Sequence, residues 1–230
     1  MGNQCFWYLE DADLQKMMDP KKSMEIRDQL IHRKFKKSEK IYMPDDAADK
    51  IFFVMEGRVK ISSTGEEGKE VTKIIINQGE IFGELALVGE AKRRDHATAL
   101  EQTTLCVMSL QEMQSIMKSQ SSISMFIMKI LGSRVVDMEK RLESLVFRDS
   151  RTRIIEFILD LVEKKGQRVG YEMVVRKFLT HQEIANMTAT SRQTVTTVLN
   201  DLRSKNLLTF DRKRLLVRDV ENLEKEKTLA

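Results

Sequence analysis

The hydrophobic pattern of this 230-residue chain changes once, near Leu110, and that change constrains the fold more than any other feature. Upstream of it, six of the ten glycines fall between positions 57 and 89. The β-forming runs around them are Lys40–Met43, Ile51–Met55, Arg58–Ser62, Val71–Ile76, Ala97–Glu101 and Thr104–Ser109. Short strands separated by glycine turns predict an antiparallel sandwich or small barrel. We expect Met1–Arg33 to be helical and to pack against this β unit.

Downstream of Leu110 the strand signals stop, and one long helix is predicted from Ser121 to Phe147, about 40 Å in length at ~1.5 Å per residue. Apolar residues recur along it every three or four positions, namely Ile123, Ile127, Leu131, Val135, Met138, Leu142 and Leu145. Two interpretations stay open: the helix lies on the core of its own domain, or it pairs with the same helix of a second chain. In both, water covers the polar face, which carries Lys129, Arg134, Lys140 and Arg141.

A separate small domain is predicted from Asp149 onward. It opens with a second amphipathic helix, Arg151–Lys164, which Gly166 ends. The apolar side of this helix is formed by Ile154, Ile155, Ile158, Leu159 and Val162. We expect the charged run Glu221–Lys227 at the other end of the domain to be a tail.

Two short helices joined by a tight turn are predicted inside this domain. Thr180-His181-Gln182-Glu183 has the pattern of a capping box, and a short helix with Ile184 and Ala185 inward follows it. After the turn Met187–Thr190 a new helix begins at Ser191. Its buried positions are Val195, Val198, Leu199 and Leu202, and its outward positions are Arg192, Gln193, Thr196, Thr197 and Asn200. This order of elements is typical of a DNA-binding helix-turn-helix.

The chemistry of the second helix and of its surroundings suits double-stranded DNA. An Arg side chain can bond guanine, and a Gln side chain can bond adenine, each through two hydrogen bonds. The segments Leu207–Phe210 and Leu215–Val217 predict two strands around a basic hairpin, Asp211-Arg212-Lys213-Arg214, which would form a wing. Between Arg176 and Arg218 nine Lys or Arg residues face three Asp or Glu, an excess of positive charge that phosphate binding requires.

The composition argues against several other classes. Lys+Arg 39 and Asp+Glu 35 give a net charge of +4, so a surface for nucleic acid has to be local. Two cysteines, Cys5 and Cys106, cannot supply a disulfide framework or an iron–sulfur cluster, and three scattered histidines argue against a metal site. We expect a cytoplasmic protein with no membrane contact, because the sequence has no apolar run of ~18 residues and no signal peptide. It also lacks a nucleophile–base pair and a nucleotide-hydrolysing loop, so we expect no catalytic residues and no enzyme activity.

A second functional signal lies at Gly79-Glu80-Ile81-Phe82-Gly83-Glu84-Leu85-Ala86-Leu87. A strand ends here at a glycine and a short helix begins, so free backbone amides point at whatever binds there. Glu84 supplies a carboxylate, and Arg93 and Arg94 follow within ten residues as a candidate phosphate clamp. The pattern predicts a site for a small anion.

The segment Thr180–Leu208 resembles the helix-turn-helix of the CRP/FNR family of bacterial transcription regulators. Ser191-Arg192-Gln193-Thr194-Val195 stands where that family typically has Ser-Arg-Glu-Thr-Val. The resemblance implies that Arg192 reads guanine, that Gln193 and Thr197 tune neighbouring bases, and that phosphates are contacted by Thr180, Gln182, Ser191 and Thr194. Gln193 replaces the usual Glu, and Thr197 replaces an Arg of the best-known member, so we expect a different half-site. Ala189 stands where a turn glycine is common.

The segment Gly79–Leu87 closely resembles the phosphate-binding cassette of cyclic-nucleotide-binding domains. There a Glu holds the ribose 2′-hydroxyl and an Arg holds the cyclic phosphate. The residues that this implies for an effector are Gly83, Glu84, Leu85, Ala86, Arg93, Arg94, and Met138 and Glu139 on the long helix. The match departs from a cyclic AMP sensor because Arg94 follows Arg93 where Ser or Thr is usual, and because Glu139 suits the adenine contact poorly. Cyclic AMP, another small anion, haem on His96 and control by abundance alone stay open.

Together these features predict an α+β chain: an antiparallel β-roll with N-terminal helices (1–120), a dimerisation helix with a hinge at Phe147–Ser150 (121–148), and a winged helix-turn-helix (149–230). We expect a homodimeric transcription regulator that binds a pseudo-palindromic operator and, as an activator, contacts RNA polymerase. The alternative is a ligand-binding regulatory subunit whose C-terminal domain docks protein rather than DNA.

Overall fold

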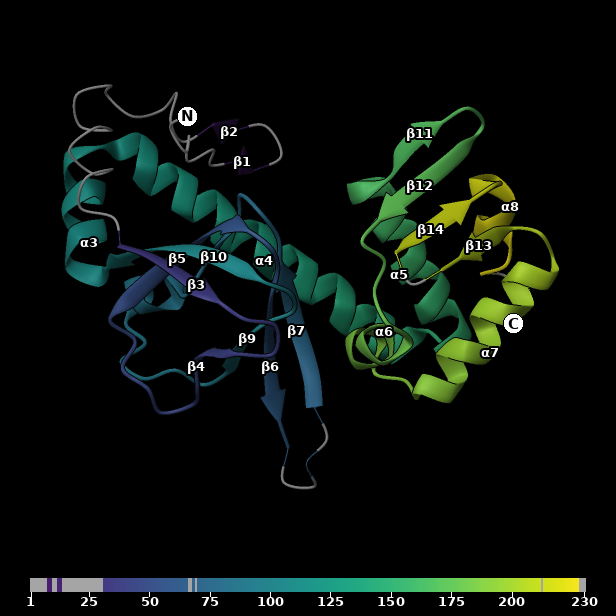
Figure 1. The fold of residues 1–230 in the computed structure, drawn as a ribbon, viewed down its shortest axis with the longest axis horizontal. Coiled ribbons are helices and arrows are strands. Elements are labelled where there is room, and N and C mark those ends of the chain that lie inside the picture. Colours follow the sequence, from purple (N-terminus) through teal and green to yellow (C-terminus); the bar gives the residue numbers. More distant parts are fainter. Residues whose placement is uncertain are drawn as a thin grey trace. The chain divides into compact units, whose positions relative to one another are not determined.

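The computed structural model describes Tyr8–Leu9, Ala12–Asp13, and residues 31–65, 68, 70–211 and 213–227 (Figure 1). The chain divides into two compact units, Met1–Val135 and Val136–Ala230. Antiparallel sheets and helices occur in both, as the α+β prediction requires.

The first unit contains two four-stranded sheets, in the orders β3-β10-β5-β8 and β4-β9-β6-β7. The strands are β3 (Ile31–Phe35), β4 (Lys40–Tyr42), β5 (Lys50–Glu56), β6 (Val59–Thr64), β7 (Glu70–Ile76), β8 (Ile81–Phe82), β9 (His96–Ala99) and β10 (Thr103–Ser109). All of their pairings are antiparallel. The six predicted strands are confirmed, and β3 and β8 are additional.

The continuous apolar run of β5 is explained by burial on both faces. Because side chains alternate along a strand, Ile51 and Phe53 enter one hydrophobic cluster and Phe52 and Val54 enter another. The first cluster also contains helical residues, whereas the second lies among strands of the two sheets. A strand buried on both faces loses the polar–apolar alternation of a half-buried one.

The expected helix over Met1–Arg33 is wrong where the chain is described. Tyr8–Leu9 (β1) and Ala12–Asp13 (β2) pair as short antiparallel strands, and Ile31–Arg33 belong to β3. The other residues of that span lie outside the described part of the chain. Most of β3 is exposed, and its pairing with β10 places it at a sheet edge. A strand held by main-chain bonds to one neighbour leaves little apolar pattern in the sequence.

The long helix α4 spans Ser121–Phe147, as predicted, and follows α3 (Leu110–Ser119). Its first half is buried in the first unit through Ile123, Phe126, Ile127 and Ile130. The later residues of the apolar stripe, Val135, Met138, Leu142 and Leu145, are between 42% and 71% exposed. The interpretation of a helix on its own core therefore holds for the first half only, and the rest of the stripe is uncovered in the single chain.

In its described residues, the second unit contains the end of α4, four further helices and one four-stranded sheet in the order β11-β12-β14-β13. Its elements after α4 are α5 (Ser150–Lys165), β11 (Gln167–Val169), β12 (Glu172–Arg176), α6 (His181–Thr188), α7 (Arg192–Ser204), β13 (Leu208–Phe210), β14 (Arg214–Val217) and α8 (Val220–Lys225). The predicted wing hairpin is confirmed as β13 and β14, with Arg212 outside the described residues. Sequence reasoning missed β11 and β12, which extend the same sheet.

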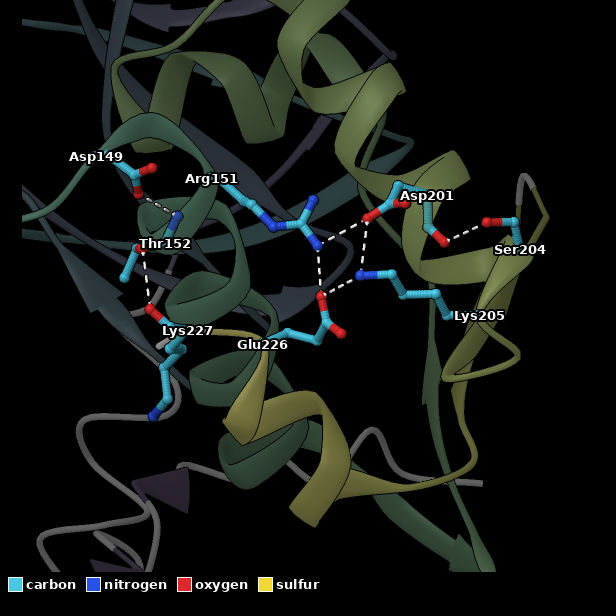
Figure 2. A network of polar contacts seen from close by, with 8 residues as sticks. All are labelled: Asp149, Arg151, Thr152, Asp201, Ser204, Lys205, Glu226 and Lys227. Carbon is cyan, nitrogen blue, oxygen red and sulfur yellow. Dashed lines mark hydrogen bonds and ion pairs between the residues drawn. The ribbon is translucent and has the colours of Figure 1, made fainter. Parts of the chain in front are cut away.

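The expected C-terminal tail is instead a packed helix, α8. Leu223 is fully buried, and Glu226 is only 7% exposed. The Glu226 carboxylate accepts hydrogen bonds from Arg151 (2.6 Å) and Lys205 (2.7 Å), and Arg151 also pairs with Asp201 (2.7 Å). Figure 2 shows these four charged groups converging from α5, α7 and the end of α8. The network ties the C-terminal segment to the helices that carry the helix-turn-helix.

The turn between α6 and α7 passes through Ala189, whose φ of 50° and ψ of 47° lie in the left-handed region. The turn is shorter than predicted, because Met187 and Thr188 still belong to α6. A non-glycine residue in this conformation costs ~1–2 kcal/mol. The geometry therefore explains why a glycine is common at this position.

Replacing Glu226 by Gln is expected to lower the free energy of unfolding by about 1–2 kcal/mol at pH 7, because Arg151 and Lys205 each lose one of their two anionic partners. The hydrogen bond from Lys205 holds the pKa of Glu226 below its ordinary value, and the bond from Arg151 does the same for the pKa of Asp201. This stability is present above the ordinary pKa of Glu, about 4.3, and is lost as pH falls through the folded-state value. Urea denaturation should show a difference between wild type and variant at pH 7 that shrinks as pH falls below about 4.3.

The matched control is Glu221→Gln, the same substitution at an exposed position of α8. It should change stability by less than ~0.5 kcal/mol. An equal loss in both variants would mean that the charge of α8, rather than the network, stabilises the unit.

Replacing Ala189 by Gly is expected to raise the free energy of unfolding by up to ~1 kcal/mol, because relief of the left-handed strain exceeds the added freedom of the unfolded chain. Ala185→Gly, inside α6 and fully buried, should instead lower it by ~1 kcal/mol. Thermal unfolding of the two variants beside wild type checks the opposite signs. Destabilisation by both would show that Ala189 is not strained.

Candidate DNA-binding surface and effector site

The helix α7 is set up by its own cap and its buried stripe. Ser191 caps it, because the backbone N–H of Thr194 donates to Ser191 Oγ at 3.0 Å. The predicted inward residues, Val195, Val198, Leu199 and Leu202, are all buried. With that stripe fixed, the opposite face of α7 is exposed to solvent.

The structure places the predicted DNA-contacting residues on α6 and α7. Thr180, Gln182, Ser191, Arg192, Gln193 and Thr197 are exposed, and Thr194 and Thr196 are half-buried. The capping box at the start of α6 is confirmed: Thr180 Oγ1 accepts from the Glu183 N–H at 3.2 Å, and the Thr180 N–H donates to the Glu183 carboxylate at 2.7 Å. Gln182 donates to Asn186 Oδ1 at 2.8 Å along the same helix.

The charges of this surface leave Arg192 available. Of the three acids between Arg176 and Arg218, Glu183 is engaged in the capping box and Asp201 with Arg151. The third, Asp211, accepts from the backbone N–H groups of Lys213 and Arg214 and pairs with the Arg214 side chain at 3.2 Å. Within the described chain no carboxylate pairs with Arg192. Its guanidinium is therefore free to bind an external acceptor, as base reading requires.

Arg153 holds the turn of the helix-turn-helix, and sequence reasoning missed it. From α5 its Nε donates to Thr188 O at 3.0 Å, and its Nη2 donates to Ala189 O at 3.2 Å. Its Nη1 donates to Arg148 O at 2.9 Å, just before α5 begins. Arg141 of α4 adds a bond to Asn186 O at 3.4 Å. The acceptors are main-chain carbonyls, which every residue has, so no sequence motif predicts these bonds.

The cassette predicted to bind an anion has the expected local geometry. After β8, Gly83 adopts a φ of 82°, and the short 3₁₀ helix η1 (Glu84–Val88) begins. A side chain at Gly83 would bring a Cβ within 3.0 Å of Lys50 O and 3.1 Å of Arg93 Nη1. Both the positive φ and the close approach therefore require glycine here.

Glu84 is 3% exposed and forms an ion pair with Arg134 of α4. Arg134 Nη2 also donates to Ile81 O at 2.5 Å. A carboxylate this deeply buried needs a cation, because an uncompensated buried charge costs several kcal/mol. Arg134, which sequence reasoning placed on a solvent-covered face, supplies that cation.

Arg93 is 4% exposed and is bound by the protein itself. Its Nη1 donates to Gly83 O at 3.1 Å, its Nη2 donates to Lys50 O, and its guanidinium lies 4.7 Å from the centre of the Tyr42 ring. Burial raises the pKa of Tyr42, although the Arg93 charge opposes this, so the tyrosine stays neutral at ordinary pH. The contacts hold Arg93 inward, beside Gly83.

The other predicted effector residues divide into two groups. Arg94 is exposed and pairs with Glu90 at 3.1 Å, while Ala86 is buried and Leu85 is partly exposed. Met138 and Glu139 are exposed on the part of α4 that belongs to the second unit. Their contact with an effector stays a prediction.

One acceptor atom and one donor atom at the cassette have unused hydrogen-bonding capacity. Glu84 Oε2 and Arg93 Nε are buried and have no hydrogen-bond partner in the described chain. The guanidinium groups of Arg93 and Arg134 both bind main-chain carbonyls of this cassette, and Arg134 also pairs with Glu84. These residues fit a small anion that also carries a hydroxyl donor for Glu84, a description that includes a cyclic nucleotide.

The described residues contain no group of three or more His, Cys, Asp and Glu side chains arranged to hold a metal ion. None of the helices in the described residues is long and apolar enough to cross a membrane.

Both the cassette region and the helix-turn-helix region match known protein families. Residues 32–120 match the cyclic nucleotide-binding domain, and residues 152–226 match the Crp-like helix-turn-helix domain. The global nitrogen regulator of Synechocystis is 30% identical over 197 residues, covering 84% of this chain and 87% of that protein. The CRP-like cAMP-activated global transcriptional regulator of Mycobacterium tuberculosis is 25% identical over 206 residues, covering 90% of this chain and 92% of that protein.

Among solved structures, a CooA variant from Carboxydothermus hydrogenoformans is similar with a TM-score of 0.77 and 27% identity, covering 88% of this chain and 90% of that one. The two matched domains occur in the same order as the predicted sensing and DNA-reading regions. With a relative at 30% identity over most of its length, the chain belongs to the CRP/FNR family of transcription regulators, with a cyclic-nucleotide-binding-type β-roll and a DNA-binding helix-turn-helix.

Proposed function

We propose that this chain forms a homodimer that binds a pseudo-palindromic operator, activates transcription, and responds to a small anion. The observation that carries the proposal is the exposed face of α7, where Arg192 has no acidic partner among the described residues. A cation left free at the start of a capped, well-packed helix is suited to the major groove.

The uncovered stripe of α4 supports the dimer. Val135, Met138, Leu142 and Leu145 continue the spacing of the buried residues before them, yet they remain exposed in one chain. The occupant we propose is the same stripe of a second copy, because a helical seam of this spacing is self-complementary. Two copies of α7 in successive major grooves, about 34–36 Å apart, then require a pseudo-palindrome.

Gln193 sets the proposed sequence preference apart from that of the family. An amide can bond adenine through two hydrogen bonds, whereas the carboxylate usual at this position accepts from cytosine. Thr197 offers only a hydroxyl and a methyl group. We therefore propose a half-site in which Arg192 reads a guanine and Gln193 favours adenine beside it.

Selection of duplexes from a random library, with and without cyclic AMP, tests the proposal. A palindrome recovered in both conditions means that the free dimer is competent and that another signal or abundance controls it. A palindrome recovered only with the nucleotide makes cyclic AMP the effector. If nothing is enriched, the salt dependence of residual binding decides, because a steep slope indicates phosphate contacts and a flat one indicates the protein-docking alternative.

Arg192→Ala is expected to lose about 1–3 kcal/mol of discrimination at one base pair of each half-site, because the bidentate contact disappears. Binding isotherms on the selected operator and on its single-base variants give this number. Arg203→Ala, at the other end of α7, is the matched control and should keep the wild-type base preference. Equal weakening of Arg192→Ala on operator and random DNA would assign Arg192 to phosphate instead.

The anion site is proposed to act through the contacts of Arg93 and Glu84. A bound anion would accept a hydrogen bond from Arg93 Nε, and its hydroxyl group would compete with Arg134 for the Glu84 carboxylate. Since Arg134 belongs to α4, this exchange would alter how that helix is held, and a ligand shifts an equilibrium only through such differential contacts.

Ligand binding at this site should raise the thermal midpoint of the wild-type protein, and Arg93→Gln should abolish the rise. Arg94→Gln, one residue away and exposed, should keep it. Cyclic AMP is the first probe, followed by other small anions with the same two variants. A shift that survives in Arg93→Gln would move the anion to another site.

We propose further that the protein works in the cytoplasm, where its DNA and RNA polymerase are found. Transcription in vitro from a promoter carrying the selected operator tests the activating role. An increase in transcript that depends on the added protein supports activation, and a decrease makes it a repressor at that promoter.

A further inference from the structure

His181, the first residue of α6, connects α6 to α7 and to the wing. Its Nδ1 lies 2.8 Å from Thr196 Oγ1, and its ring meets the Phe210 ring of β13 edge-on, with centroids 5.4 Å apart. The Thr196 hydroxyl donates its proton to Arg192 O at 2.9 Å. The same oxygen must therefore accept from His181, which fixes Nδ1 as the protonated ring nitrogen. Nε2, with no partner in the described chain, is the nitrogen that gains or loses a proton.

The charged groups around His181 disfavour a second proton in the free protein. Burial, together with the positive charge of Arg192 on α7, holds the pKa of His181 below its ordinary value. On its own helix, the Glu183 carboxylate is committed to Thr180. On the side of β13, the Phe210 ring is uncharged, and the cation Arg203 lies 5.2 Å from its centre.

The acid next along the wing does not supply the missing negative charge. Asp211 is engaged with Lys213 and Arg214. The described surroundings of the imidazole are therefore dominated by cations, and at neutral pH the ring is uncharged. A protonated His181 would therefore need an external anion to stabilise its charge.

We propose that His181 is a proton-coupled contact to the DNA backbone, in which Nε2 takes up a proton from solvent and donates it to a phosphate oxygen. The inference rests on the proposed function, because it needs DNA on the surface formed by α6 and α7. Thr180 and Gln182 are exposed on either side of His181, and Arg192 lies at the start of α7, so the phosphate would meet a hydrogen-bonding surface. Its negative charge would stabilise the imidazolium that the free protein disfavours.

The coupling has a defined direction. DNA raises the pKa of His181, so the complex holds more protons than its separate components between the free and bound pKa values. In that window the affinity rises as pH falls, by up to about tenfold per chain for each pH unit. A dimer carries two copies of His181. The other two histidines, His32 and His96, belong to the first unit, so His181 is the sole histidine of the second.

The test measures dissociation constants of the full-length protein at pH 6, 7 and 8 and constant ionic strength, on the selected operator and on a random duplex. For wild type the constant should fall severalfold from pH 8 to pH 6 on both DNAs, since every duplex offers phosphates. His181→Gln, which keeps a donor but cannot titrate, should lose this pH dependence. His32→Gln, an exposed change on β3, should keep it.

The outcomes separate this inference from the proposed function. Equal pH dependence in wild type and His181→Gln, or none in wild type, overturns the proton coupling while DNA binding stands. A pH dependence confined to the operator overturns the phosphate contact in favour of a base contact. Absence of DNA binding at every pH overturns the proposed function itself.

A second measurement avoids reliance on a folded variant. The imidazole resonances of three histidines can be followed by nuclear magnetic resonance as pH changes, with and without a short duplex. The resonance missing from the His181→Gln spectrum identifies the site. An upward shift of its midpoint on adding DNA supports the coupling, and an unchanged midpoint overturns it.

Discussion

Arginine side chains bound to main-chain carbonyls hold both functional regions of this chain. In the second unit, Arg153 joins the end of α6 and the left-handed Ala189 to the residues that precede α5. In the first, Arg93 and Arg134 bind the carbonyls of Gly83 and Ile81, which precede Glu84. A guanidinium has five donors in a fixed plane, so one side chain can set the distance between separate backbone segments. The positions of α7 and of the cassette depend on these bonds.

The same chemistry makes the cassette a competitive site. The carboxylate and the guanidinium that the family resemblance gives to a ligand are already engaged, Glu84 by Arg134 and Arg93 by carbonyls. An anion therefore gains only the difference between its own contacts and the ones it replaces. In such a site selectivity depends on which ligand can replace the present hydrogen bonds of Glu84, Arg93 and Arg134 together, rather than on the charge of the ligand alone.

The elements with their own periodicity were predictable, and those held by a neighbour were not. The stripe of α4, the capping box at Thr180 and the buried face of α7 follow from side-chain spacing. The edge strand β3 and the strands β11 and β12 were missed because they are stabilised by pairing with other strands. The roles of Arg134 and Arg153 were missed for a related reason: their partners are a distant carboxylate and backbone oxygens, which leave no local pattern. The predicted DNA and effector contacts are surface roles that remain predictions.

The ring of charges around Glu226 also constrains how related sequences can diverge. Arg151, Asp201, Lys205 and Glu226 come from three separate segments and neutralise one another. Loss of Glu226 alone would leave two cations sharing one carboxylate, that of Asp201, so it should be accepted only together with loss of one cation. In a set of homologues these positions should therefore co-vary as a group, although they are up to 75 residues apart in the chain.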